Sequence, residues 1–202
     1  MPSDSLPREF YDRDPTTVAR QLLGKTLRRR TRRGLTSGTI VEVEAYLSKN
    51  DSAAHSYRGP TRRNAVMFGP PGHLYVYSIH SRYCLNTVTE ARGTASAVLI
   101  RAIEPLAGIA IMQARRERMV LVDLARGPAR LCEALHVDRE LNGWDLSRGS
   151  RIWIDDADAL PTRSLRIGQS NRIGVTSAYE ARLRFFVDGS RFVSGLRRDH
   201  SR

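Results

Sequence analysis

The most regular pattern of apolar and polar positions lies in residues 38–46. Apolar and polar side chains alternate there, and a period of two predicts a β-strand with two different faces. The polar face carries two carboxylates and one aromatic ring: Glu42, Glu44 and Tyr46. Because glutamate is uncommon in strands and like charges on one face repel, this face is either exposed to water or lines a site.

Eight further segments are predicted to be strands. They are short, apolar or alternating in polarity, and bounded by turn signals; they cover residues 25–33, 73–80, 82–89, 94–104, 151–155, 171–176, 183–187 and 191–193. The first should form a hairpin with the strand of residues 38–46, and the last two should pair across Asp188-Gly189-Ser190. Residues 1–202 are therefore predicted to form one α+β domain with a mostly antiparallel sheet and loose tails at 1–7 and 197–202.

Three helices are predicted from their N-terminal signals. The first begins after Asp14, which is placed as the N-cap, has Pro15 at its first position and ends at Gly24. The second covers residues 108–119. The third opens at Gly127-Pro128 and has apolar side chains at core spacing.

The charge balance changes the picture. Lys and Arg number 33 against 21 Asp and Glu, a net charge of +12, and Lys25 and Lys49 are the only lysines. A coding bias that turns Lys into Arg would explain the identity of the cations but not their excess. Arginine suits phosphate, and a basic protein favours nucleic acid as its partner. The arginines of residues 28–33 and 115–118 are expected on solvated faces, with some of them in contact with phosphates.

The cysteines and histidines indicate neither a disulfide framework nor a metal site. Cys84 and Cys132 are the only cysteines, and no histidine has the spacing of a zinc ligand. The sequence shows no signal peptide and no apolar run long enough to cross a bilayer. We therefore expect a cytoplasmic protein without a metal, another cofactor or a membrane partner.

Ten short motifs occur along the chain in a fixed order. They are Glu-Ala-Tyr-Leu (44–47), Ala-Ala-His-Ser (53–56), Arg-Asn (63–64), Met-Phe (67–68), Pro-Gly-His-Leu-Tyr-Val-Tyr (71–77), Cys-Leu-Asn (84–86), Val-Leu-Ile-Arg-Ala-Ile-Glu-Pro (98–105), Gly-Pro-Ala-Arg-Leu-Cys (127–132), Arg-Ile-Gly-Val (172–175) and Leu-Arg-Phe-Phe-Val (183–187). Together they cover roughly residues 8–198, and the chain resembles the methylpurine type of 3-methyladenine DNA glycosylase, the alkyladenine DNA glycosylase family.

The resemblance implies a curved antiparallel sheet, a hairpin that enters the DNA minor groove, and a general base at Glu44. It further implies a pocket for an extruded base. In this pocket the rings of Tyr46, His55 and Tyr77 would contact the base. Asn86 would lie beneath the base and reject the amino group of guanine, and Arg101 would support the nucleotide and a water. The family uses neither a metal nor a covalent lysine intermediate.

The chain departs from the family pattern at the hairpin tip. The family commonly places a tyrosine there as the wedge that fills the vacated base stack, whereas this chain has His80. The segment 80–86 is also one residue shorter than the usual form. Strand parity puts His80 on the side opposite to Tyr77, as a wedge requires, so we predict that His80 is the DNA wedge.

These residues predict a monofunctional DNA glycosylase of base excision repair, acting as a monomer on double-stranded DNA that contains alkylated or modified purines. An extruded purine can stack on aromatic rings, and tyrosine faces favour a cationic alkylated base. A carboxylate can stabilise oxocarbenium character at the sugar and take a proton from the attacking water. A lyase reaction would need an amine nucleophile, and neither lysine matches a catalytic position of the family.

Three alternatives stay open at this point. Glu42, two residues from Glu44, is a second candidate for the base, since two close carboxylates titrate together. A catalytically silent, basic nucleic-acid-binding module could share the fold. A carbohydrate hydrolase that uses both glutamates is disfavoured, because neighbouring same-face positions lie too close for the usual separation of the two carboxylates.

Overall fold

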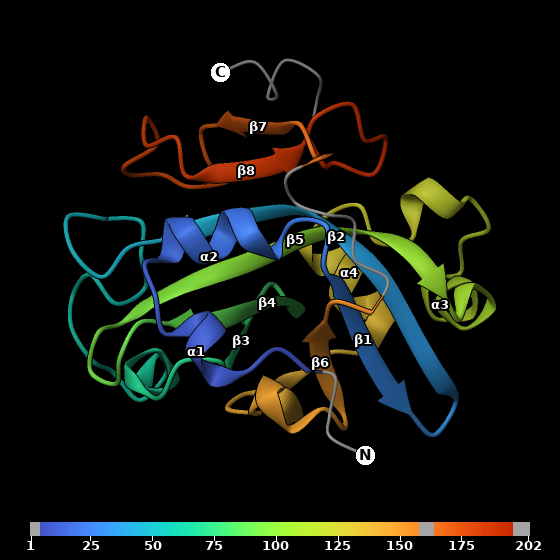
Figure 1. The fold of residues 1–202 in the computed structure, drawn as a ribbon, viewed down its shortest axis with the longest axis horizontal. Coiled ribbons are helices and arrows are strands. Elements are labelled where there is room, and N and C mark those ends of the chain that lie inside the picture. The colour runs from blue at the N-terminus through green and yellow to red at the C-terminus, as the bar shows by residue number, and fades with distance from the viewer. Residues whose placement is uncertain (1–4, 158–163, 196–202) are drawn as a thin grey trace.

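The computed structural model describes residues 5–157 and 164–195, which form a curved sheet with helices packed against it (Figure 1). The strands are β1 (Thr26–Thr31), β2 (Gly34–Tyr46), β3 (Leu74–Ile79), β4 (Arg82–Thr89), β5 (Ser96–Ala107), β6 (Ile152–Asp155), β7 (Ile167–Ser170) and β8 (Arg184–Val187). The α-helices are α1 (Arg8–Tyr11), α2 (Pro15–Leu22), α3 (Ile109–Arg116) and α4 (Pro128–Leu135). The predicted α+β class and the mostly antiparallel sheet are confirmed.

Strand β2 is the centre of the sheet. The strand order is β3-β4-β5-β2-β1-β6, and every pair is antiparallel. On one edge β2 pairs with β5 from Ser37 to Tyr46. On the other edge its first half pairs with β1, and residues 42–44 pair with β8, which in turn pairs with β7. With strands on both edges, residues 36–45 are all buried, so the polar face of β2 is not exposed to water.

The pleat of the sheet separates an apolar face from a polar one. On the apolar face the register aligns one row of side chains across five strands, all of them in the main hydrophobic core: Val76, Leu85, Ile100, Val43 and Phe185. Helices α2 and α4 pack into the same core. Val43 and Ala45 of the β2 alternation therefore hold the fold together, which leaves the opposite face for a site. Val41 lies in a separate cluster, because the register of β2 with β5 shifts on both sides of Glu42.

Helix α2 forms as its signals predict. The Asp14 side chain accepts hydrogen bonds from the backbone N–H groups of Thr16 and Thr17, at 2.9 and 3.0 Å, and Pro15 opens the helix. Leu22 and the following Leu23 are completely buried, and each contributes roughly 1.5–3 kcal/mol by leaving water. The helix predicted from Pro128 is confirmed as α4. The helix predicted over residues 108–119 is also present, as α3, but it ends at Arg116, because Glu117 has left-handed backbone with φ 48°.

Two predicted strands near the C-terminus are wrong. Residues 171–176 form no strand; the residues before them form β7. Residues 191–193 form no strand either, because β7 and β2 occupy the two edges of β8 with which these residues were predicted to pair. Phe192 is instead held by side-chain packing against Val41 and Ala102.

Two smaller predictions also need correction. Strand β5 does not end at Pro105 but continues through it to Ala107, at a register shift opposite Ser37 and Gly38 where a proline is tolerated. Residues 5–7 are not loose, since the Leu6 N–H donates to the carbonyl oxygen of Ile154 at 2.8 Å. The rest of the predicted tails, 1–4 and 197–202, lies outside the described residues.

Candidate active site

One row of side chains crosses five strands on the polar face of the sheet. The register aligns Tyr75 on β3, Asn86 on β4, Leu99 on β5, Glu44 on β2 and Arg184 on β8. Side chains two residues along each strand lie on the same face, so the face also carries Tyr46, Tyr77, Ala97 and Arg101. Glu42, at a register shift of β2, joins this face through its contact with Arg101. The cross-strand register is therefore what assembles the candidate site from distant parts of the sequence.

A pocket of about 280 Å³ opens on this face. Its volume lies near the lower end of small-molecule pockets. Its wall includes the predicted residues Tyr46, His55, Tyr77 and Asn86, together with Tyr75 and the segment 174–177. Arg101, the remaining predicted pocket residue, is not in the wall but lies behind it.

Three aromatic rings form one side of the pocket. The His55 ring meets the Tyr77 ring edge to face with centroids 4.5 Å apart, and Tyr77 stacks on Tyr75 at 5.3 Å. His55 Nδ1 and the Tyr75 hydroxyl are hydrogen-bonded at 2.9 Å. Burial and the nearby Arg63 lower the pKa of His55, and burial raises the pKa of Tyr75 to about 12. This side of the pocket is thus aromatic and uncharged near neutral pH.

Tyr46 contributes a ring that is held from behind. The Arg172 guanidinium lies over that ring, 4.6 Å from its centroid. Arg172 is fixed in turn by two hydrogen bonds of 2.7 Å to the Asp51 carboxylate, in a completely buried ion pair. One face of Tyr46 is therefore covered by the protein, and the other is the face that a ligand in the pocket can use.

Asn86 lies on the pocket floor with only 3% of its surface exposed. Its side-chain Nδ2 donates to the carbonyl oxygen of Tyr75 at 3.0 Å. This bond fixes the orientation of the amide, so a ligand in the pocket would meet a rigid polar group.

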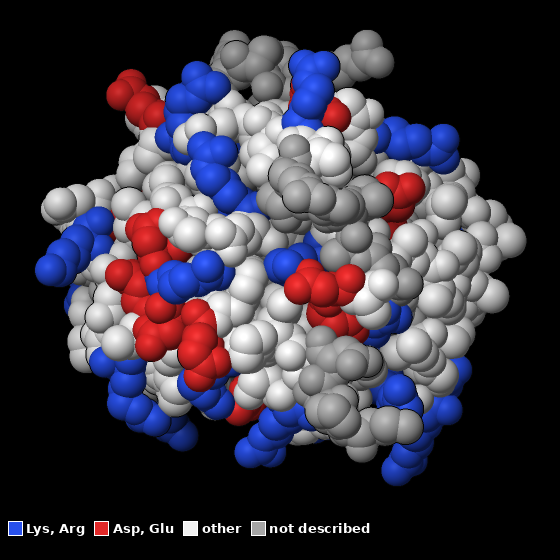
Figure 2. Space-filling view, viewed as in Figure 1, with Lys and Arg blue, Asp and Glu red and all other residues white. Residues whose placement is uncertain are grey.

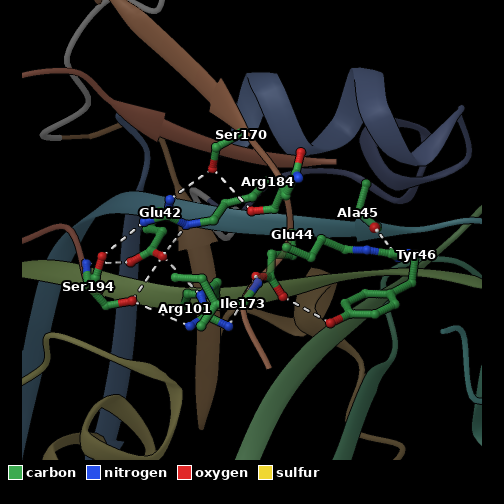
Figure 3. A network of polar contacts seen from close by, with 11 residues as sticks. Glu42, Glu44, Ala45, Tyr46, Arg101, Ser170, Ile173, Arg184 and Ser194 are labelled. Carbon is green, nitrogen blue, oxygen red and sulfur yellow. Dashed lines mark hydrogen bonds and ion pairs between the residues drawn. The ribbon is translucent and has the colours of Figure 1, made fainter. Parts of the chain in front are cut away.

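Glu44 is completely buried behind Tyr46, and Figure 3 shows its partners. Oε2 accepts from the Tyr46 hydroxyl at 2.9 Å, and Oε1 accepts from the Ile173 N–H at 2.8 Å. Arg101 Nη1 lies 3.2 Å from Oε1. Because each carboxylate oxygen has two lone pairs, Oε2 keeps one acceptor position beside Tyr46.

Glu42 is the centre of a buried network next to Glu44 (Figure 3). Its Oε1 accepts from Arg101 Nε at 2.9 Å, from Arg184 Nε at 2.7 Å and from the Ser194 hydroxyl at 2.9 Å, while Oε2 accepts from the Ser194 N–H at 2.7 Å. Burial alone would raise the pKa of Glu42, but the two arginines and the Ser194 N–H outweigh it and the pKa lies below its usual value. Glu42 is therefore an ionised structural group that positions Arg101 against Glu44.

The hairpin of β3 and β4 ends in a two-residue turn at its tip. His80 and Ser81 form the turn, both exposed and both with positive φ, 45° and 65°. Ile79 before them is 48% exposed and lines the pocket on the same face as Tyr77. The structure thus places His80 at the tip beside the pocket; its role as a wedge stays a prediction.

Comparison with known proteins decides the family. The sequence model for methylpurine-DNA glycosylase (MPG) matches residues 9–191. A protein of Rhodopirellula baltica is 48% identical over 205 residues, covering 99% of this chain and 87% of the relative. A protein of Methanoculleus marisnigri is 48% identical over 191 residues, covering 94% and 98%. Both carry the name "Putative 3-methyladenine DNA glycosylase".

The chain belongs to the methylpurine-DNA glycosylase family. The predicted family is thereby confirmed. Within the described residues of this family member, no group of three or more His, Cys, Asp or Glu side chains is arranged to hold a metal ion. Nor do the described helices include one that is long and apolar enough to span a membrane.

Several parts of this glycosylase-family site were missed from the sequence. Arg184 and Ser194 complete the Glu42 network, and the Ile173 N–H binds Glu44. An arginine inside the apolar run of residues 183–187 was a usable signal, because arginine is rarely buried without a partner. The other two contacts left no signal, since a backbone N–H and a common serine have no distinctive pattern.

Proposed function

We propose that this methylpurine-DNA glycosylase family member is a monofunctional DNA glycosylase that removes alkylated purines, 3-methyladenine among them, from duplex DNA. The observation that carries the proposal is the 2.9 Å contact between the Tyr46 hydroxyl and Glu44 Oε2, which joins a buried carboxylate to an aromatic pocket. In this proposal the purine is flipped into the pocket and water hydrolyses its N-glycosidic bond.

The pocket suits a flat, cationic ring. The base would lie between the free face of Tyr46 and the wall of His55 and Tyr77, and stacking is worth roughly 1–3 kcal/mol per base. Alkylation gives the purine a positive charge, which tyrosine faces attract. Burial and Arg63 lower the pKa of His55, so its imidazole is neutral near pH 7 and does not repel that charge.

Glu44 is the better general base of the two glutamates. Glu42 accepts four hydrogen bonds from Arg101, Arg184 and Ser194, and none of these three residues lines the pocket. Glu44 accepts from the Tyr46 hydroxyl, which belongs to the pocket wall, and from the Ile173 N–H, and it pairs with Arg101. Its Oε2 keeps one acceptor position beside Tyr46. That position would receive the proton of the attacking water, and the charge would stabilise oxocarbenium character at the sugar.

Water needs a route to Glu44, which is fully buried. Two of its contacts belong to groups at the pocket: the Tyr46 hydroxyl and the N–H of Ile173, next to the lining segment 174–177. In the proposed reaction, binding of the extruded nucleotide turns one of these groups aside and admits a water beside Oε2. Catalytic hydrogen bonds commonly reach their final geometry only in the substrate complex.

The DNA backbone would bind next to the pocket. A groove of about 600 Å³ shares Tyr77 with the pocket and is lined by Arg62, Arg63 and Arg139. These arginines would hold phosphates beside the extruded nucleotide, while His80 at the hairpin tip would fill the gap in the base stack. Affinity for duplex DNA should then fall with salt, with a slope of about −0.9 per phosphate contact in a log–log plot.

Release of free base separates this proposal from its rival, a binding module that has lost the chemistry. A duplex treated with a methylating agent is incubated with the protein, and free purines are measured by chromatography. The proposal expects 3-methyladenine in the supernatant and an abasic duplex without strand cleavage; binding without any release would establish the rival. Borohydride should trap no adduct, since Lys25 pairs with Asp156 and Lys49 is exposed outside the pocket wall.

A further inference from the structure

A third cavity, of about 700 Å³, lies at the opposite end of β2 from the base pocket. Its lining includes six arginines and only one carboxylate, that of Glu140. They come from β1 and the turn after it, from α3, and from the residue before β6: Arg29, Arg30, Arg32, Arg33, Arg115 and Arg151. We call this cavity the arginine groove. Figure 2 shows Lys and Arg side chains grouped at the lower right edge, where Figure 1 places the turn between β1 and β2.

Neutral groups hold the inner arginines of the groove. Arg29, 5% exposed, donates to the backbone carbonyl oxygens of His136, Arg30 and Arg151 at 3.1–3.3 Å. Arg115 donates to the Ala134 carbonyl oxygen and to the Thr31 hydroxyl, each at 2.9 Å. The prediction that the arginines of residues 28–33 all lie on a solvated face is thus wrong for Arg29, whose guanidinium is built into the groove wall.

The positive charge of the groove is largely unneutralised. Across residues 5–157 and 164–195, the only ion pair that involves a lining arginine is that of Arg151 with the exposed Glu140, at 3.6 Å. Burial and the positive charges of Arg151 and Arg115 lower the pKa of Arg29, although Asp138 and Glu140 act in the opposite direction. The pKa of Arg115 is also lowered, by burial and by the charge of Arg33. At the candidate active site, by contrast, the buried Arg101, Arg172 and Arg184 each pair with a carboxylate. Crowded cations without counter-charges favour a polyanion as ligand.

The groove is too far from the base pocket to serve the same short stretch of DNA. Gly34 and Tyr46 mark the two ends of β2, and twelve steps along a strand span roughly 40 Å. A duplex centred on the base pocket would need about 12 base pairs on that side alone to reach the groove, at 3.4 Å each.

We propose that the arginine groove binds the phosphate backbone of a second DNA segment while the base pocket holds the first. The charge complements a sugar–phosphate chain, and the exposed Arg32 and Arg33 at the turn are free to follow it. Such a second contact would let the protein pass from one duplex to another without dissociating completely. The inference builds on the proposed function but names a site that excision itself does not need.

The test is the number of short duplexes that one chain binds. Undamaged duplexes of about 8 base pairs, whose full length of roughly 27 Å cannot join the two sites, are added in excess at low salt and the complex is measured by sedimentation. The unmodified chain should bind two. The double variant R32E/R33E should bind one and still excise base from a short lesion duplex at the unchanged single-turnover rate.

A matched variant controls for loss of charge. R130E/R166E changes two exposed arginines that line neither cavity, and it should still bind two duplexes. The proposal is overturned if the unmodified chain binds only one duplex, if R32E/R33E still binds two, if R130E/R166E loses the second duplex as well, or if R32E/R33E loses excision. If no chain excises base but two duplexes bind, the proposed function fails and the groove stands.

Discussion

Replacing Glu44 with glutamine tests the proposed chemistry most directly. The amide keeps the shape of the side chain, and its oxygen can still accept from the Ile173 N–H, which donates to Oε1 at 2.8 Å. The Tyr46 hydroxyl can rotate to accept from the new NH₂ group. The change removes the negative charge and the proton acceptor, and little else.

The expected loss of rate follows from the role of a general base. General-base catalysis contributes about 10²–10⁴-fold, which equals about 3–5 kcal/mol of barrier. The stability cost should be smaller. Arg101 loses its contact with Glu44 at 3.2 Å but keeps Glu42 at 2.9 Å, and a hydrogen bond to a charged group contributes about 1.5–3 kcal/mol.

The assay separates chemistry from binding. A duplex with one methylated purine is mixed with excess protein, and base release is followed through a single turnover. Fluorescence anisotropy of the same duplex then gives the affinity. Glu44→Gln should release base at least about 100-fold more slowly and bind the duplex as tightly as the unmodified chain or slightly more tightly, because one negative charge near the DNA is gone.

Glu42→Gln is the internal control. Glu42 accepts from two buried arginines and from Ser194, and breaking such a buried pair costs about 3–5 kcal/mol of folding free energy. This variant should therefore lower the denaturation midpoint more than Glu44→Gln does, while its folded fraction retains more activity. The reasoning is refuted if Glu44→Gln excises at the normal rate; if folded Glu42→Gln is then inactive, Glu42 is the base.

Three further outcomes are expected. His80→Ala should weaken binding to a lesion duplex and slow excision at low enzyme concentration with an unchanged melting temperature, and His80→Tyr should restore both; normal excision by the alanine variant would place the wedge elsewhere, at Arg82 or Tyr83. Asn86→Ala should raise the release of normal guanine relative to 3-methyladenine, and unchanged discrimination would leave Asn86 a structural residue that binds the Tyr75 carbonyl. Burial alone would raise the pKa of Asp51, but hydrogen bonds from Arg172 and from two backbone N–H groups hold this pKa below its usual value. The ionised Asp51 therefore stabilises the fold fully above about pH 4, the usual carboxyl pKa, and this stabilisation is lost as the pH falls through the lowered pKa of the folded state. Asp51→Asn should lower the urea midpoint at pH 7 and flatten its acid decline, and an unchanged midpoint would contradict this account of the Arg172 ion pair.

The sequence determined most of the local structure of this protein. The alternation in residues 38–46 placed Glu42, Glu44 and Tyr46 on one face of β2, because the pleat of a strand has a fixed period of two. Asp14 and Pro15 set the start of α2 through hydrogen bonds and backbone angles within a few residues. The ten motifs were enough to predict the family that the comparisons show.

Only the tertiary structure decided what the polar face of β2 does. Whether that face is exposed to water depends on the pairing of β2 with β5 and β8. This pairing is long-range, since Arg184 on β8 lies 140 positions after Glu44 in the chain. The same pairing brings Arg101 and Arg184 to Glu42, puts Ser194 and the Ile173 N–H against the two carboxylates, and leaves one acceptor position on Glu44. The strand predicted over residues 171–176 failed for the same reason: β7 takes the place beside β8, and the residues after it cover the site. The free energy that selects these contacts comes from long-range strand pairing and burial, which no local stretch of sequence contains.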